Sequence, residues 1–202
     1  MNIRFLTLLL FLLLNANAPA EERIAMVRED GMLVFLPEVA GQGTYGTYLV
    51  PNALGREQLD RFVYEGNPVQ INFLAGENFG RAFVRMEEKE KLQEFLRTES
   101  KHLTKAFGQP VEFTDLESFR AGGVDYLAGT STVTAPDGKK LKMRVTARTA
   151  GSGILHAAYQ ESNRATLGKA QSMVDRLLRS FKLVNRPLTP DELTAISQKA
   201  RD

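Results

Sequence analysis

Three consecutive segments in the second half of the chain have the pattern of β-strands joined by tight turns. They span residues 124–134, 141–148 and 154–160, and the turn signals Pro136-Asp137-Gly138 and Gly151-Ser152-Gly153 separate them. In the middle segment, apolar and polar residues alternate, which places them on opposite faces of a strand. Strands joined by such short turns pair antiparallel. This part of the chain therefore predicts an antiparallel meander.

Two segments carry the apolar stripe of an amphipathic helix. The first spans residues 87–107, with acidic residues in its first turns and Gly108 directly after it. In the second, apolar residues recur at helical spacing from Ala170 to Phe181. Because each stripe has to be buried and the sheet is the available partner, the sequence predicts an α+β fold. In that fold, an antiparallel sheet is packed by two long amphipathic helices.

The first half of the chain predicts shorter elements. Two apolar runs around Asp30-Gly31 predict a hairpin over residues 23–36. Apolar residues at helical spacing predict a short helix within residues 55–64. Alternation over residues 69–73 and 82–86 predicts the two strands of a second hairpin.

The N-terminus has the three-part pattern of a secretory signal peptide. Arg4 precedes a largely apolar run of 10 residues, and the small residues up to Ala20 suit a cleavage site. That run is shorter than the roughly 20 residues that span a bilayer, although an uncleaved anchor stays open as the alternative. The predicted organisation is a signal peptide over residues 1–20, one α+β domain over 21–185 and a short helical appendage over 186–202. The protein is accordingly expected to be exported, either periplasmic or secreted.

The net charge and the amino-acid composition reduce the number of possible function classes. Loss of Arg4 with the signal peptide leaves 25 basic and 24 acidic residues, a net charge of +1. This near-balance argues against a dedicated nucleic-acid binder, which normally has a basic excess. The chain has no cysteine, so it uses no disulfide. A domain of this size buries enough apolar surface to fold without one.

Residues 41–51 have the G-x-G-x-x-G spacing of nucleotide-binding loops. A dinucleotide site needs a helix directly after its glycines, so that the helix N-terminus meets the pyrophosphate. Here an extended run and Pro51 follow Gly46. The stretch is therefore predicted to form a strand, a turn and a strand, and no cofactor is expected. Tyr45 and Tyr48 would lie near the tip of that turn, where exposed tyrosines suit a protein contact.

The two histidines offer little catalytic chemistry. His102 is expected at the border of the apolar stripe on the first long helix. His156 could form an acid–base pair with Asp125 or Glu161, which is the basis for the alternative that the protein is a small periplasmic hydrolase. With no cysteine and only two histidines, the sequence has no cluster typical of a metal site. No catalytic residue, metal ligand or cofactor is assigned.

Basic residues alternate along one predicted strand and recur on the second hairpin. If these strands are neighbours, they form a cationic surface that would meet an anionic lipid, a glycan or an acidic protein patch. The alternative is an ordinary solvated sheet face. The residues concerned are Arg81, Arg85, Lys142, Arg144 and Arg148.

Residues 69–185 resemble the PsbP-like fold family, which includes an extrinsic photosystem II protein. The resemblance rests on the order hairpin, helix, strand meander and closing helix, and on the ending MVDRLLRSFKLV. It implies an accessory or binding role without catalysis and transfers no functional residue. The sequence therefore predicts an exported, non-catalytic binding or accessory protein of the bacterial envelope. It would act through protein contacts, with another envelope protein as its partner.

Overall fold

The computed structural model describes residues 24–28, 31–37, 44–51, 55–58, 61–64, 67–134, 138–160, 164–184, 186 and 189–190. The predicted signal peptide lies outside these residues. So does Glu161, and so does nearly all of the predicted C-terminal appendage.

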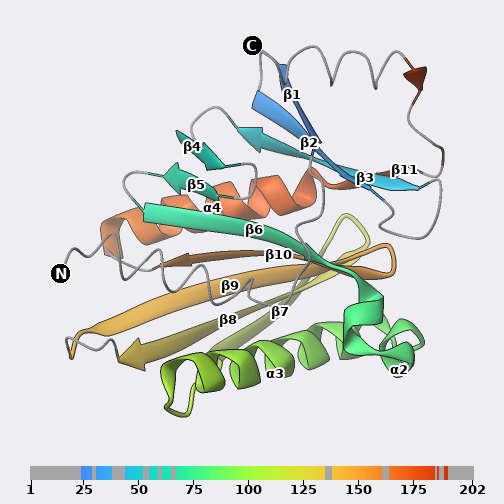
Figure 1. Ribbon diagram of the computed structural model, residues 1–202. Helices are drawn as coiled ribbons and strands as arrows, with labels where there is room; N and C mark the ends of the chain where they lie inside the picture. Colours follow the sequence, from blue (N-terminus) through green and yellow to red (C-terminus); the bar gives the residue numbers. More distant parts are fainter. Residues whose placement is uncertain are drawn as a thin grey trace.

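A seven-stranded sheet forms the centre of the molecule (Figure 1). Its strand order is β4-β5-β6-β10-β9-β8-β7, and every neighbouring pair is antiparallel. The predicted meander is confirmed as β8, β9 and β10. The strands are β4 (Gly55–Gln58), β5 (Arg61–Tyr64), β6 (Asn67–Leu74), β7 (Thr114–Ala121), β8 (Val124–Thr134), β9 (Lys140–Ala150) and β10 (Gly153–Gln160).

A second, four-stranded sheet combines the first strands of the chain with the last. Its order is β1-β2-β3-β11, again antiparallel throughout. The predicted first hairpin is present as β1 and β2. The strands are β1 (Ile24–Arg28), β2 (Gly31–Pro37), β3 (Tyr45–Pro51) and β11 (Lys182–Val184).

The described helical segments are η1 (Gly76–Phe79), α2 (Arg81–Val84), α3 (Glu88–Phe107) and α4 (Arg164–Arg179). With 20 residues, α3 is the long helix, whereas α4 has 16. A capping box between Glu87 and Glu90 begins α3, and Gly108 ends it in the left-handed region at φ 64°. These are the boundaries that the sequence predicts for this helix.

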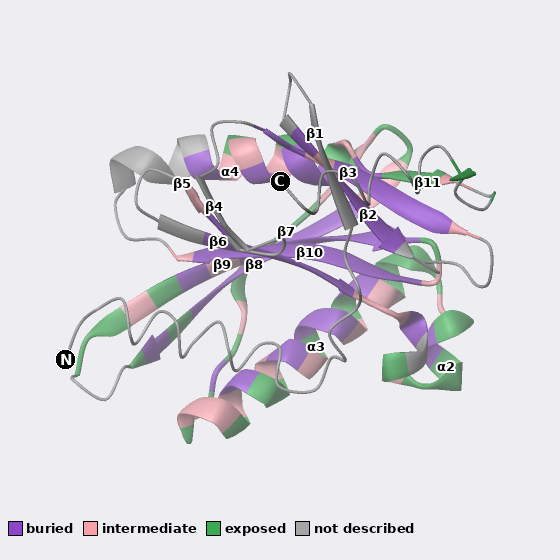
Figure 2. Ribbon diagram, turned by 45° about the horizontal axis from the view of Figure 1, so that its top comes forward, coloured by how far each residue is buried: buried purple, intermediate pink, exposed green. Residues whose placement is uncertain are grey.

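The two longer helices cover opposite faces of the seven-stranded sheet. α3 packs on β8, β9 and β10, and α4 packs on β9, β10 and also β3 (Figure 1). α4 therefore lies between the two sheets, and its apolar residues join one large core with both of them. Val34, Tyr48, Leu155 and Leu177 are fully buried there, and Figure 2 shows the buried residues along both sheets. Burial on several sides explains why the stripe of α4 is so broad.

The end of α4 is tied to the four-stranded sheet. The amide of Leu49 donates to Ser180 Oγ at 2.8 Å, and that hydroxyl donates to the carbonyl of Leu177 at 2.6 Å. The chain then continues into β11, where Leu183 lies opposite Gly46 of β3. The Ser-Phe pair in the ending MVDRLLRSFKLV thus fixes the junction between helix and sheet.

The predicted short helix within residues 55–64 is wrong. This stretch forms β4 and β5 instead, which extend the large sheet beyond β6. Phe62 lies opposite Val69 and is 1% exposed. The stretch is too short for a stable helix of its own, and pairing with β6 satisfies its backbone while burying an aromatic residue.

The predicted strand over residues 82–86 is also wrong. Gly80 turns the chain at φ 90°, and α2 follows. The rings of Phe79 and Phe83 stack with centroids 4.2 Å apart, and Phe83 is buried while Val84 is 47% exposed. The partly buried Phe79 and the buried Phe83 have the i, i+4 spacing of a helix, and their contact overrides the alternation that suggested a strand.

Candidate functional site

The two tyrosines predicted at an exposed turn are both buried in β3. Tyr48 is fully buried in the core beside α4, and Tyr45 is 5% exposed with its ring centroid 5.9 Å from that of Phe35. Their predicted exposure to a partner is therefore wrong. Gly46 lies within β3, so no helix follows the glycine spacing, as the sequence predicts. Gly41 and Gly43 lie outside the described residues.

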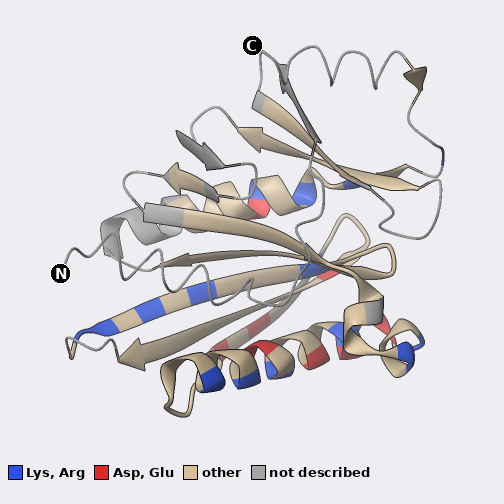
Figure 3. Ribbon diagram, viewed as in Figure 1, with Lys and Arg blue, Asp and Glu red and all other residues tan. Residues whose placement is uncertain are grey.

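The five basic residues predicted to form one cationic sheet surface do not share a face of the sheet. Arg81 begins α2 and Arg85 caps its end, so neither lies on a strand. The other three lie along β9, where Figure 3 shows cationic residues at intervals. Among these three, only Lys142 is exposed.

Arg144 and Arg148 are both engaged within the protein. The Arg144 Nη2 donates to Glu117 Oε2 at 2.7 Å, and the Arg144 side chain is only 11% exposed. Arg148 is buried under the end of α4. Its Nη1 donates to the carbonyl of Leu178 at 3.1 Å, and its Nε donates to the carbonyl of Thr149 at 3.0 Å. Burial lowers the pKa of Arg148 from its ordinary value. These two cations stabilise the fold rather than present charge to a partner.

The histidines lie apart in the structure. His102 is on α3, with its Nδ1 3.6 Å from Glu99 Oε1, and this hydrogen-bonding partner raises the pKa of His102. His156 lies in β10, 3% exposed, with its ring centroid 4.8 Å from that of Phe95. Asp125, near the start of β8, is paired with Arg120. Within the described residues, no group of three or more His, Cys, Asp or Glu could hold a metal ion.

A surface pocket of about 230 Å³ lies between the first turns of α3 and the β7–β8 hairpin. Leu92 and Leu127, both nearly fully buried, supply its apolar floor, and polar side chains form its rim. A pocket with an apolar floor and a polar rim is typical of a site that holds one anchoring side chain of a partner. The lining residues are Lys89, Leu92, Gln93, Ser118, Phe119, Arg120, Asp125, Tyr126 and Leu127.

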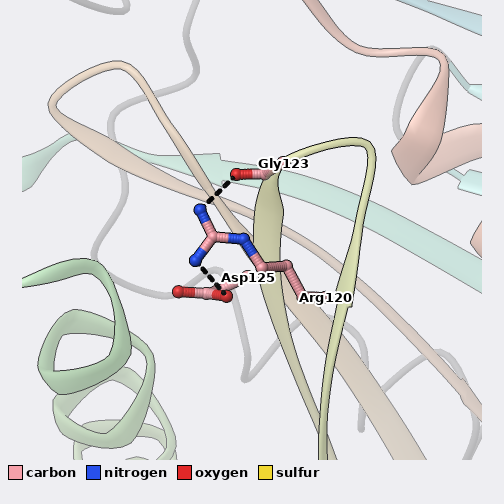
Figure 4. Close-up of polar contacts among 3 residues, drawn as sticks. All are labelled: Arg120, Gly123 and Asp125. Atoms are coloured by element: carbon pink, nitrogen blue, oxygen red, sulfur yellow. Dashed lines mark hydrogen bonds and ion pairs between the residues drawn. The ribbon is translucent and has the colours of Figure 1, made fainter.

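Arg120 is held over this pocket by its own hairpin. Its Nη2 donates to the carbonyl of Gly123 at 2.9 Å, and its Nη1 lies 3.5 Å from Asp125 Oδ1 (Figure 4). The Arg120 side chain is still 67% exposed. The guanidinium is thus oriented by the fold and remains open to a second anion. Lys89 adds another cation at the rim, so the pocket carries one positive charge in excess.

β7 is the last strand of the seven-stranded sheet, so one of its edges has no neighbouring strand among the described residues. Most of its side chains are exposed, including Leu116 at 61%. An exposed strand edge is a template for pairing with another chain. We call the pocket together with the edge residues Leu116, Ser118 and Arg120 the β7 groove.

The tight turn at Gly122-Gly123 sets which backbone groups of β7 face outward. Both glycines have positive φ, 59° and 81°, as a type I′ hairpin turn requires. Ala121 and Val124 close this turn as a hydrogen-bonded pair, and Phe119 pairs in the same way with Tyr126. By alternation, the amides and carbonyls of Ser118 and Arg120 point away from β8, toward the open edge.

The sequence contained only part of the signal for this groove. Gly122-Gly123 is a recognisable hairpin turn, and residues 114–121 could have been assigned to an edge strand by their many polar residues. The pocket itself depends on α3 lying across β8, which joins residues 89–93 to residues 118–127. No short-range sequence pattern predicts that contact between distant segments.

The structure is similar to several solved structures, among them a cyanobacterial PsbP and LpqN. No protein-family model and no curated protein matches the sequence. The structure is similar to the solution structure of cyanobacterial PsbP from Synechocystis, with TM-score 0.43 and 13% identity over 83% of this chain and 96% of that one. It is also similar to the crystal structure of LpqN, described as involved in cell envelope biogenesis of Mycobacterium tuberculosis. There the TM-score is 0.36, with 10% identity over 83% of this chain and 87% of that one.

The first of these two proteins is named as a PsbP, the family whose element order residues 69–185 resemble. With TM-scores below 0.5, neither similarity bears on function. Among the described residues, no helix has the length and hydropathy to cross a membrane.

Proposed function

We propose that the protein is an exported, non-catalytic accessory protein of the bacterial envelope that binds another envelope protein through the β7 groove. The signal-peptide pattern of residues 1–20 supports export. The placement of α3 and α4 on opposite faces of an antiparallel sheet supports assignment to a PsbP-like layered sandwich. Both assignments are compatible with a protein that presents one binding surface to a partner.

One observation carries the proposal: an apolar-floored pocket lies directly beside an open strand edge. Protein interfaces draw most of their binding energy from a few anchor side chains in well-packed pockets. Leu92 and Leu127 offer such a floor, while Gln93 and Ser118 offer hydrogen-bonding groups at the rim.

The hydrolase alternative gains no support from His156 and Asp125, and Glu161, the other acid considered for His156, lies outside the described residues. His156 is packed against Phe95 on the α3 side of the sheet, and Asp125 is held by Arg120. A general base has to reach its partner within hydrogen-bond distance. No described contact joins these two residues.

Site-specific photo-crosslinking in intact envelopes tests the proposal. A photo-reactive amino acid at Gln93, on the pocket rim, should capture one discrete envelope protein. The same amino acid at Lys182, an exposed residue of β11 away from the groove, should not capture it. Equal capture from both positions, or no capture from Gln93, would contradict binding through the β7 groove.

A further inference from the structure

We infer that the partner binds as an extended segment that adds to β7 as an antiparallel strand and carries the pattern acidic-x-apolar. This inference rests on the proposed function, because it specifies how a protein partner occupies the β7 groove. The occupant of the groove is a short segment of another protein.

The open edge of β7 presents backbone groups that can pair with an added strand. Ser118 and Arg120 each direct an amide and a carbonyl toward the open edge, as the register with β8 requires. An antiparallel strand exchanges two hydrogen bonds with each such residue. Strand addition at an exposed edge is a recurring way to bind extended peptides.

The pocket receives one side chain of the added strand. Residues opposite each other in an antiparallel pair have side chains on the same face of the sheet. Ser118 lies opposite Leu127, whose side chain faces α3 and forms part of the pocket floor. The partner residue opposite Ser118 therefore projects into the pocket, where Leu92 and Leu127 favour an apolar side chain.

The charges around the groove select the partner residue that lies opposite Arg120. The partner residue opposite Arg120 lies on the same face, beside two cations and one carboxylate: Arg120, Lys89 and Asp125. This excess of positive charge favours an acidic side chain at that position. Because the two strands run in opposite directions, the acidic residue comes two positions before the apolar one. The resulting pattern is acidic-x-apolar.

The structure also limits the length of the added strand. The register between β7 and β8 shifts between Thr114 and Glu117, and Asp115 has φ 50°. Such a bulge twists the edge and interrupts further pairing. At the other end, the turn at Gly122-Gly123 closes the hairpin. The regular edge thus spans Glu117 to Ala121, enough for a short segment and too short for extended sheet aggregation.

Selection from a random peptide display library tests the inference with a defined probe. The full chain without its predicted signal peptide should enrich peptides with Asp or Glu two positions before Leu, Ile, Phe or Val. Ser118→Pro removes one outward amide, and an edge strand tolerates proline there. Its affinity for the enriched peptides should fall about tenfold or more, whereas Ser118→Thr, which keeps the amide, should bind them clearly more tightly than Ser118→Pro. Equal binding by both variants, or no enrichment, would overturn strand addition.

A second variant keeps the test decisive if Ser118→Pro fails to fold. Arg120→Glu should change the enriched pattern to Lys or Arg two positions before the apolar residue. An unchanged preference for acidic residues would contradict the assignment of Arg120. If photo-crosslinking from Gln93 captures a partner and the library yields no strand-like peptide, the proposed function stands and only strand addition is refuted. If Gln93 captures nothing, the proposed function itself fails.

Discussion

The guanidinium carbon of Arg148 lies 5.0 Å from the ring centroid of Phe181, which joins the centre of the large sheet to the end of α4. The same guanidinium lies 5.6 Å from the ring centroid of Tyr126 and donates to the carbonyl of Leu178. A cation at a helix C-terminus is stabilised by the helix dipole, and the two aromatic faces add cation–π attraction. These contacts compensate the desolvation of a buried charge.

Arg148→Met should destabilise the protein by about 2 kcal/mol. The substitution removes a charged hydrogen bond to Leu178 and both aromatic contacts, while it relieves part of the cost of burying a charge. Lys140→Met is the matched control, because Lys140 is an exposed cation of the same strand. Its effect should stay within about 0.5 kcal/mol. Urea unfolding of the three proteins measures both values, and equal losses would show that Arg148 has no special role.

Ser180→Ala should cost about 1 kcal/mol and loosen the four-stranded sheet more than the large one. The substitution removes the acceptor of the Leu49 amide, which then lies partly buried without that hydrogen bond. Hydrogen exchange of the Leu49 amide should accelerate. Ser118→Ala, at an exposed serine, should leave it unchanged. Faster exchange throughout the protein, with no preference for Leu49, would argue against a local tie between α4 and β3.

Gly153→Ala should destabilise the protein by about 3 kcal/mol. A Cβ at Gly153 would overlap the carbonyl oxygen of Leu74 and lie 2.8 Å from Phe73 Cζ, and a backbone oxygen cannot move aside. Gly129→Ala is the control, since its Cβ would meet the flexible end of Leu116 at 3.0 Å. That substitution should cost about 1 kcal/mol or less. Thermal unfolding of both variants distinguishes them, and similar losses would contradict the close strand approach at Gly153.

His102 should make stability depend on pH. Its pKa in the folded state is raised above 6.5, chiefly by the hydrogen bond to Glu99. The stabilisation is therefore fully present below pH 6.5 and is lost as the pH rises through the folded pKa. His102→Gln should remove this dependence. Melting temperatures of both proteins between about pH 5 and about pH 8 check it, and a constant difference across that range would rule out His102 as the titrating group. The imidazole is half exposed, so the effect should be small.

The sequence predicted the elements whose signals are local. The start and end of α3 follow from Glu87, Glu90 and Gly108, and the strands β8 to β10 follow from alternation and turn glycines. Residues 55–64 and 82–86 were predicted wrongly because each segment is short. There, tertiary contacts of Phe62 and Phe83 decide between helix and strand.

The candidate site could hardly be predicted from the sequence. Tyr48 and Arg148 have polar atoms and were expected at the surface, yet packing on both sides of α4 buries them. A chain with one sheet covered on both faces by helices leaves few polar positions of its strands in solvent. The strand edge of β7 remains one of them, and only the strand order reveals that it is an edge.

Hydrogen exchange of the free and partner-bound protein tests the central claim most directly. With the partner captured from Gln93 bound, the amides of Ser118 and Arg120 should gain at least about tenfold protection. The amide of Phe119, which already faces β8, should change little. Protection that leaves Ser118 and Arg120 unchanged while another surface becomes protected would contradict binding at the β7 groove.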